Sequence, residues 1–234
     1  MAQSIADESE SNVRLIMENL KPVHLILSRP FEKLRSGASR FWGNPDLPAG
    51  VGYPMYTDDE GDDFPYYFIC QINLAELAAF APENPLPKSG LLSFFGKIDH
   101  YLDYMAATDG ILGYISAPED VKVLYFPSTD DMREVVIVDD NNTPTSPEEM
   151  EIGFAWDADP LSPEHALFAE PTHREWETWD HPFEKWRILL QIDSFDGMDF
   201  NLNFMDFGVL DFLISPEDLR TGNFGQVRAI VLST

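Results

Sequence analysis

Short apolar runs, separated by polar and turn-forming residues, dominate the chain and are typical of β-strands. The clearest runs span residues 23–27, 66–72, 90–98, 121–127, 135–138, 151–157, 188–192, 207–215 and 226–233. They are rich in Val, Ile, Phe and Tyr, the residue types that fit a pleated and partly buried surface. The pattern therefore predicts a strand-dominated protein.

Helical patterns are fewer than strand patterns. Apolar residues at helical spacing predict one helix over residues 4–20. Asn73, with a Glu three residues later, has the pattern of a capping box, and Thr172 repeats it. Ser162, followed by Pro, is a further helix start, and Ser215 opens a short helical turn. We expect these helices to be short and peripheral.

Residues 37–65 are dense in Gly and Pro, which prevent regular structure and favour turns. We expect a long loop here. Its aromatic residues indicate that it packs against the body of the protein.

One sequence pattern occurs twice. Residues 68–77 read FICQINLAEL and residues 188–197 read ILLQIDSFDG, so each places a Gln in an apolar run before Ile and then Asn or Asp. The strands that follow the two copies also agree in order and residue type, which we interpret as an internal duplication. It predicts an α+β, strand-dominated fold in which two related β-rich halves share one core, with short peripheral helices.

This interpretation sets the domain boundaries. Residues 1–20 are the N-terminal helix, residues 21–140 the first β-rich half and residues 141–234 the second, within one compact domain. Gln71 and Gln191 then have a structural interpretation, in which each amide satisfies backbone groups where its strand ends. A catalytic role for the repeated Gln is the alternative.

The charge of the chain is one-sided. It carries 41 Asp and Glu against 15 Lys and Arg, a formal net charge of −26. Nucleic acids and anionic membranes bind through clusters of Lys and Arg, and the densest basic stretch, residues 29–40, holds only four cations. The composition excludes those partners. It favours either a function that attracts a basic partner or a cation, or charge that serves solubility alone.

Cys70 is the only cysteine, so neither an intrachain disulfide nor a cysteine-based metal site can form. The N-terminal stretch MAQSIADESESN lacks the apolar centre of a signal peptide. No apolar run approaches the ~20 residues that span a bilayer. We expect a soluble cytoplasmic protein.

Motifs of catalysis are absent from the sequence. It has no Gly-x-Ser-x-Gly elbow and no phosphate-binding glycine loop, and the spacing of its five histidines does not match a zinc site. We therefore predict no catalytic residues and no cofactor.

The acidic stretch DSFDGMDFNLNFMD (193–206) supplies the weak candidates for a calcium site. Asp and Asn residues around a Gly can supply the oxygen ligands that Ca²⁺ requires, and the candidates are Asp193, Asp196 and Asp199. The Gly is one position too early for an EF-hand and the final Glu is missing. A solvated acidic turn without a metal is the prediction.

Four parts of the chain, SRFWGNPDLP (39–48), FICQINLAEL (68–77), LPKSGLLSFF (86–95) and the segments LLQID and MDFGVLDFLISPEDL within residues 189–219, resemble the YwqG-like family of mostly bacterial proteins. The family is a domain of unknown function, and the resemblance extends from about Lys21 to the C-terminus. Trp42 stands where the family usually has Gly. The resemblance implies a duplicated α+β fold, no established activity, and an association with bacterial toxin–immunity loci.

The preferred functional hypothesis is a non-enzymatic protein-binding module whose acidic surface engages a basic protein partner. An immunity or antitoxin-like role is its sharpest form. The candidate surface combines the acidic stretch TDDEGDDF with neighbouring aromatic side chains. Its residues are Trp42, Tyr53, Tyr56, Asp58, Asp59, Asp62 and Asp63.

The alternative hypothesis is an enzyme or a small-ligand-binding protein with its site between the two halves. The cleft would be lined by Gln71, Gln191, Asp193 and His24. The sequence leaves the oligomeric state open.

Overall fold

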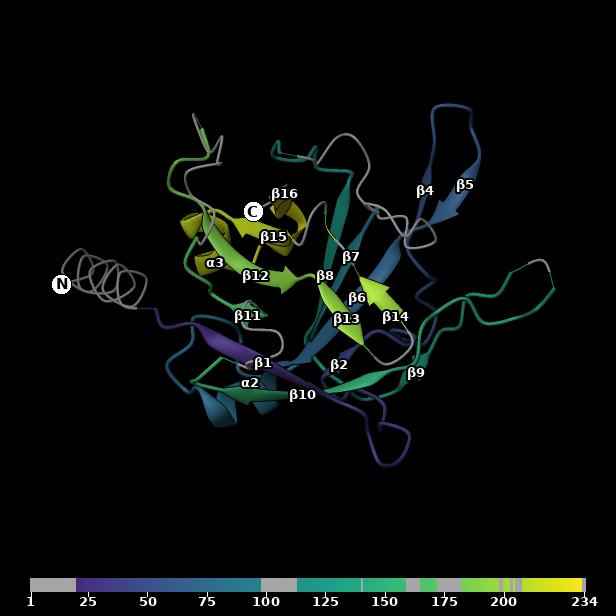
Figure 1. The fold of residues 1–234 in the computed structure, drawn as a ribbon, viewed down its shortest axis with the longest axis horizontal. Coiled ribbons are helices and arrows are strands. Elements are labelled where there is room, and N and C mark those ends of the chain that lie inside the picture. Colours follow the sequence, from purple (N-terminus) through teal and green to yellow (C-terminus); the bar gives the residue numbers. More distant parts are fainter. Residues whose placement is uncertain are drawn as a thin grey trace.

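The computed structural model describes residues 20–97, 113–139, 141–158, 165–171, 182–197, 200–202, 204 and 208–232 (Figure 1). The expected N-terminal helix, apart from Leu20, and the helix starts at Ser162 and Thr172 lie outside these residues. Within them, no helix has the length and apolar character needed to cross a bilayer.

A ten-stranded antiparallel sheet forms the body of the described chain and curls into a nearly closed barrel (Figure 1). Its strand order is β16 (Arg228–Leu232), β15 (Val209–Ile214), β12 (Arg187–Asp193), β11 (Ala166–Leu167), β1 (Val23–Ser28), β10 (Met150–Ala155), β2 (Arg40–Phe41), β6 (Tyr67–Asn73), β7 (Leu91–Gly96) and β8 (Val121–Phe126). The sheet joins strands from both sides of residue 140. The prediction of a strand-dominated fold is confirmed.

Smaller elements decorate this sheet. Three two-stranded sheets pair β3 (Asp46–Pro48) with β9 (Met132–Glu134), β4 (Met55–Thr57) with β5 (Asp63–Pro65), and β13 (Phe195–Gly197) with β14 (Phe200–Leu202). The helices of the described residues are α2 (Leu74–Phe80), α3 (Pro216–Thr221) and the 3₁₀ turn η2 (Phe224–Gln226).

Two short segments bring the ends of the large sheet together. The amide of Ser116 donates to the carbonyl of Ala229 on β16 at 2.7 Å, and the chain then continues directly into β8. On the other side η2 leads into β16, and its Phe224 ring packs on Tyr125 of β8 with centroids 5.7 Å apart. Each edge strand is therefore covered by the segment that precedes the opposite edge strand, which blocks pairing with other chains.

The main core lies inside the barrel. Phe94 of β7 and Phe212 of β15 meet there with ring centroids 5.2 Å apart. Successive residues of a strand point to opposite faces, so their neighbours Phe95 and Leu213 belong to two smaller clusters on the outer face of the sheet.

The two Gln-containing strands have matching positions in the sheet. Gln71 on β6 pairs with β2 and β7, and Gln191 on β12 pairs with β11 and β15. The register shifts in the three residues before each Gln, at 68–70 and at 188–190. The repeated sequence therefore takes up the same pairing and the same irregularity.

Two predicted helix starts are confirmed. The Asn73 side chain accepts hydrogen bonds from the amides of Ala75 and Glu76 and caps α2, and Ser215 caps α3. The capping box at Asn73 is only half formed, because the Glu76 carboxylate accepts from the Ser39 amide at 3.1 Å instead.

Two local predictions are wrong. Residues 135–138 form no strand; their β pairing within the described residues is a single bridge from Val138 to Pro144, and β9 ends just before them. Residues 37–65 are not one loop but contain β2, β3, β4 and β5. These strands have two or three residues each, too few to show an alternating pattern in the sequence.

Gly90 is a position where a side chain cannot be accommodated. Its φ is +99°, and a Cβ atom would lie 2.2 Å from the carbonyl oxygen of Phe126. Gly50 has a similar φ of +87° but open space around it. We expect Gly50→Ala to cost about 1–2 kcal/mol of unfolding free energy, the conformational penalty alone. Gly90→Ala is expected to cost at least about 2 kcal/mol more. Urea titration of both variants measures the difference, and equal losses would contradict the steric argument.

Cys70 provides a second test of the fold. The residue is fully buried, and burial raises the pKa of its thiol. Since the reactive species is the thiolate, we expect no reaction with an aromatic disulfide reagent at neutral pH until urea unfolds the chain. Cys70 is the only thiol, so the labelling curve should follow the loss of circular dichroism. Stoichiometric labelling of the native protein would show that β6 is not buried as described.

Candidate functional site

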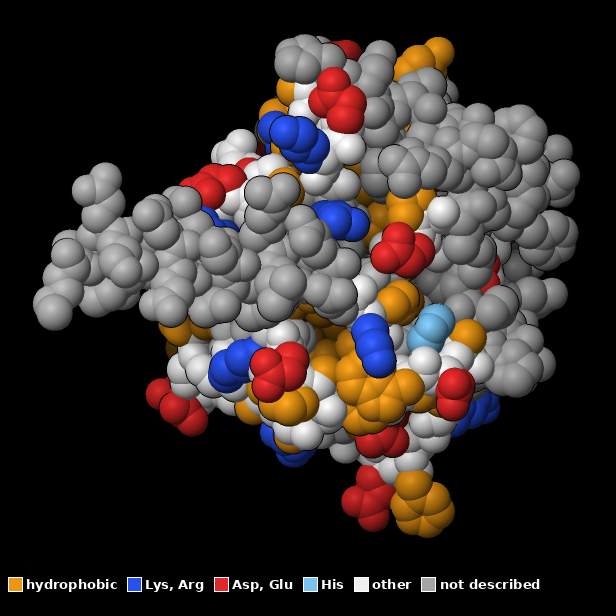
Figure 2. Space-filling model, turned by 90° about the vertical axis from the view of Figure 1, so that its left-hand side faces the viewer, with side chains coloured by type: hydrophobic (Ala, Val, Ile, Leu, Met, Phe, Trp, Pro, Cys, Tyr) orange, Lys and Arg blue, Asp and Glu red, His pale blue; other side chains and the backbone are white. Residues whose placement is uncertain are grey.

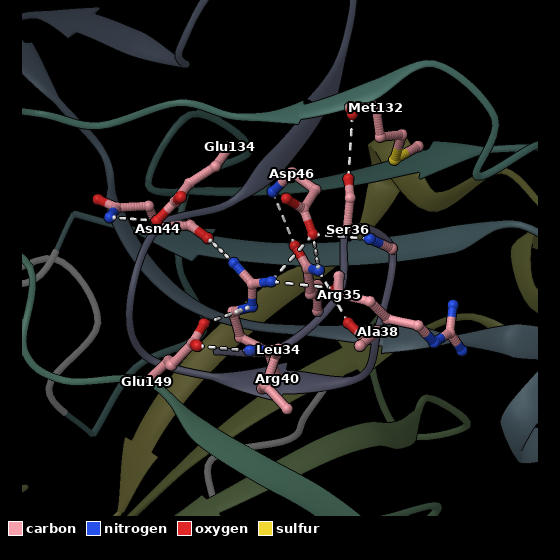
Figure 3. Close-up of polar contacts among 12 residues, drawn as sticks. Leu34, Arg35, Ser36, Ala38, Arg40, Asn44, Asp46, Met132, Glu134 and Glu149 are labelled. Atoms are coloured by element: carbon pink, nitrogen blue, oxygen red, sulfur yellow. Dashed lines mark hydrogen bonds and ion pairs between the residues drawn. The ribbon is translucent and has the colours of Figure 1, made fainter. Parts of the chain in front are cut away.

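The segment SRFWGNPDLP builds a buried cluster of polar side chains centred on Arg40 (Figure 3). Arg40 lies on β2 and its side chain is 1% exposed. Two carboxylates flank the guanidinium: Asp46 Oδ2 lies 3.2 Å from Nη2, and Glu149 Oε2 lies 3.3 Å from Nε. A buried charge is tolerated only when it is paired in this way.

Asp46 joins this ion cluster to the repeated Gln. Its Oδ2 accepts hydrogen bonds from the Gly37 amide and from Gln71 Nε2, both at 2.8 Å. Gln71 Oε1 in turn accepts from the Asp46 amide at 2.9 Å, and Gln71 Nε2 also donates to the Ala38 carbonyl at 2.8 Å. The Gln71 amide thus satisfies backbone groups, as predicted, but these belong to Ala38 and Asp46 and not to the end of its own strand.

The rim of the cluster reaches solvent. Glu149 Oε1 accepts from the Leu34 amide at 2.8 Å, and Glu134 accepts from Asn44 Nδ2 at 3.0 Å and pairs with Lys33. Partial burial raises the pKa of Glu134, but the hydrogen bonds from Lys33 and Asn44 outweigh it and hold the pKa below its usual value. The same contact raises the pKa of Lys33. All these charges are already engaged by protein groups.

Trp42 follows Arg40 and Phe41 into the core, not onto a partner surface. Its side chain is 1% exposed and packs on Phe41 with ring centroids 4.9 Å apart. Its φ of +56° lies in the left-handed region, where residues other than Gly are uncommon. Gly adopts that conformation without steric cost. Trp42 cannot belong to an acidic docking surface.

The acidic stretch of residues 57–64 forms the tip of the β4–β5 hairpin, which projects from the body of the protein (Figure 1). Asp59, Asp62 and Asp63 are exposed, and Asp58 is half-buried. Asp58 shapes the turn, because its Oδ1 accepts the amides of Glu60 and Asp62 at 2.9 and 2.8 Å.

Aromatic residues anchor the root of this hairpin. Tyr53 donates its hydroxyl to the Tyr66 carbonyl at 2.8 Å, and burial raises the pKa of Tyr53. Tyr56 packs edge-on against Tyr66 with centroids 5.1 Å apart, and Lys97 Nζ lies 5.1 Å from the centre of the Tyr56 ring. The structure therefore brings Tyr53, Tyr56 and the acids together, with the tyrosines as supports.

The four cleft candidates do not converge. Gln71 and Gln191 are both buried, on strands that β2, β10, β1 and β11 separate in the sheet. His24 lies in register with Ala166, and Ala166 lies in register with Gln191. The side chains of His24 and Gln191 are therefore on the same face of the sheet, with β11 between them. The Asp193 amide donates to Nδ1 of the buried His165 at 2.9 Å. No cleft lined by this set exists among the described residues.

The weak calcium candidates are divided. Asp196 lies on β13, opposite Asn201 of β14, and Asp199 is outside the described residues. Asp193 ends β12. Within the described part of the chain, no three His, Cys, Asp or Glu side chains gather closely enough to hold a metal ion.

A surface groove of about 420 Å³ was not anticipated from the sequence. Residues from both sides of position 140 line it: Lys33, Leu34, Arg35, Ala38, Ser39, Glu76, Glu151, Ile152 and Phe154. Arg35 pairs across it with Glu76 at 2.5 Å. Since three separate segments supply the lining, no local motif could have revealed it.

The described chain is thus a nearly closed, barrel-like β-protein that carries a buried ion cluster, an acidic hairpin and a surface groove. A family model described as "Domain of unknown function (DUF1963)" matches residues 39–231, and the chain belongs to this family. The match begins at the first residue of SRFWGNPDLP. No curated protein matches the chain.

The buried cluster makes a quantitative prediction. Arg40→Met leaves Asp46 buried without its cation, which should lower the unfolding free energy by about 3–5 kcal/mol. Lys33→Met breaks the pair with Glu134, but Lys33 is 69% exposed, so the expected cost is about 0–1 kcal/mol. Urea denaturation compares the two variants. Similar costs would mean that Arg40 is not the organising charge.

Proposed function

We propose that this protein is a non-enzymatic binding module whose acidic β4–β5 hairpin engages a basic protein partner. The observation that carries the proposal is the exposed, projecting hairpin itself, in which a hydrogen-bonded turn presents several carboxylates to solvent. In contrast, the polar side chains of the Arg40 cluster are engaged inside the protein.

The hairpin combines charge with apolar contact area. Met55 and Phe64 are 44% and 43% exposed on the two strands that flank the acidic turn. Protein interfaces pair apolar anchors with polar surroundings, and carboxylates would attract a basic partner and accelerate association. The net charge of −26 acts in the same direction.

An enzyme or small-ligand protein with a site between the halves is the weaker proposal. Its key residues Gln71 and Gln191 are buried, and both ends of the Gln71 amide are taken by protein groups. A ligand-contacting role for Gln71 would require these bonds to break.

The proposal also includes a more specific role and an origin by duplication. An immunity or antitoxin-like role within the narrower YwqG-like group is suggested by the resemblance of SRFWGNPDLP and LPKSGLLSFF. An internal duplication is supported by the matching register of Gln71 and Gln191 and by the contact of Phe94 with Phe212, one from each half.

Further backbone features support the duplication. The Trp42 amide donates to the Ile69 carbonyl at 2.9 Å, and the Phe168 amide donates to the Leu189 carbonyl at 3.2 Å. Both donors have a φ of +56°. A rare conformation in one half is thus repeated in the other.

The hairpin predicts a specific loss of binding. We expect the triple variant Asp59→Asn, Glu60→Gln, Asp62→Asn to lose the partner that wild type captures at low salt from lysate of the source cells. Asp58 is kept because it holds the turn. Quantitative proteomics of the captured material is the measurement, and the wild-type association rate should fall steeply as salt rises.

The control removes the same charge elsewhere, at Glu83→Gln, Asp131→Asn and Glu217→Gln. This variant should retain the partner, because the hairpin is intact. If the two triple variants recover the same proteins as wild type, or lose them equally, the hairpin is not the docking surface.

A further inference from the structure

Strand β10 leaves part of one edge unpaired. On one side it pairs with β1 along His24 to Ser28. On the other side β2 pairs only with Met150 and Glu151. From Ile152 onward, no strand of the described chain lies on that second side, and the groove is located there.

The backbone groups of this edge point into the groove. Leu25 is opposite Phe154 in the register with β1, yet the Leu25 amide donates away from β10, to the His165 carbonyl at 2.9 Å. In an antiparallel ladder the two residues of such a pair both direct their N–H and C=O groups outward. The N–H and C=O of Phe154 therefore face away from β1, on the groove side.

A specific contact stops β2 from covering this edge. The ladder between β2 and β10 would continue with Ser39 opposite Ile152, but the Ser39 amide donates to Glu76 Oε2 at 3.1 Å. Arg35 holds the same carboxylate through its Oε1 at 2.5 Å. The Glu76 carboxylate thus accepts the hydrogen bond from the Ser39 amide that strand pairing with β10 would have required, and the groove stays open.

The two faces of the exposed edge differ in chemistry. Phe154 and Trp156 lie on one face, where Phe80 of α2 stacks on Trp156 with centroids 4.8 Å apart. Trp156 is nevertheless 52% exposed. The other face carries Glu151, which makes no ion pair with the described residues, followed by the small Gly153 and Ala155. Figure 2 shows apolar side chains on this side of the molecule with basic and acidic ones beside them.

We propose that the free edge of β10 over Ile152–Ala155 binds an extended peptide segment of a partner protein, which adds a strand to the sheet. Its apolar side chains contact Phe154 and Trp156, and its basic side chains lie on the Glu151 face. Main-chain hydrogen bonds supply affinity in this mode, and alternate side chains supply specificity. The site is separate from the β4–β5 hairpin, so each proposal can fail alone.

Charge and shape select this occupant. The cations at the groove, Lys33 and Arg35, are already paired with Glu134 and Glu76, whereas Glu151 is not. A basic residue opposite Gly153 would be a diagonal neighbour of Glu151 on the same face, and Gly153 has no side chain to obstruct it. Half-exposed Trp156 has the character of an interface anchor.

The test uses the full-length protein and a displayed library of random linear peptides. We expect enrichment of peptides in which apolar and basic residues alternate. The best synthetic peptide should bind Trp156→Ala about tenfold or more weakly and Glu151→Gln about threefold more weakly. Phe31→Ala, which removes another fully exposed aromatic ring, is the matched control and should bind normally.

Amide hydrogen exchange measured by NMR separates strand addition from simple charge attraction. Bound peptide should slow exchange at Phe154, whereas Gly153 and Ala155, whose amides already face β1, should not change. The proposal is overturned if no peptide is enriched, if the enriched peptides bind Trp156→Ala as well as wild type, or if Phe154 exchange is unaffected.

Discussion

The buried guanidinium of Arg40 is the constraint on which the first half of the molecule depends. A charge taken out of water must keep its counter-ions in place, so Asp46 and Glu149 are fixed relative to β2. The Asp46 oxygen that faces Arg40 also accepts the Gly37 amide, and the second oxygen of Glu149 accepts the Leu34 amide. The segment that contains Leu34, Gly37 and Asp46 is thereby fixed in position, although little of it forms regular secondary structure.

This constraint also separates the interior from the surfaces available to partners. Gln71, the polar residue that stands out most in the sequence, has its side-chain amide fully hydrogen-bonded inside the cluster. The exposed groups to which our two proposals assign binding are the carboxylates of the β4–β5 hairpin and the unpaired edge of β10.

The sequence predicted most strands because their residues alternate or form apolar runs, and it predicted the caps at Asn73 and Ser215 from local chemistry. It failed where distant contacts decide. Trp42 was assigned to the candidate surface as an aromatic neighbour of the acidic stretch, but packing on Phe41 buries it. The groove depends on one bond from Ser39 to Glu76, which no local pattern encodes. The role of Gln71 was predictable, since a polar residue in an apolar run must find partners.

The central position of β1 has a consequence for how the chain folds. Its neighbours, β10 and β11, come from the second half, and more than half of the chain separates β1 from β10. Contacts over such distances along the chain slow folding, because a large loop must close before any contact is gained. During synthesis the apolar VHLILS strand therefore has no partner strand until residues 150–155 of β10 have left the ribosome. This period is when the protein depends most on chaperones and is most exposed to aggregation.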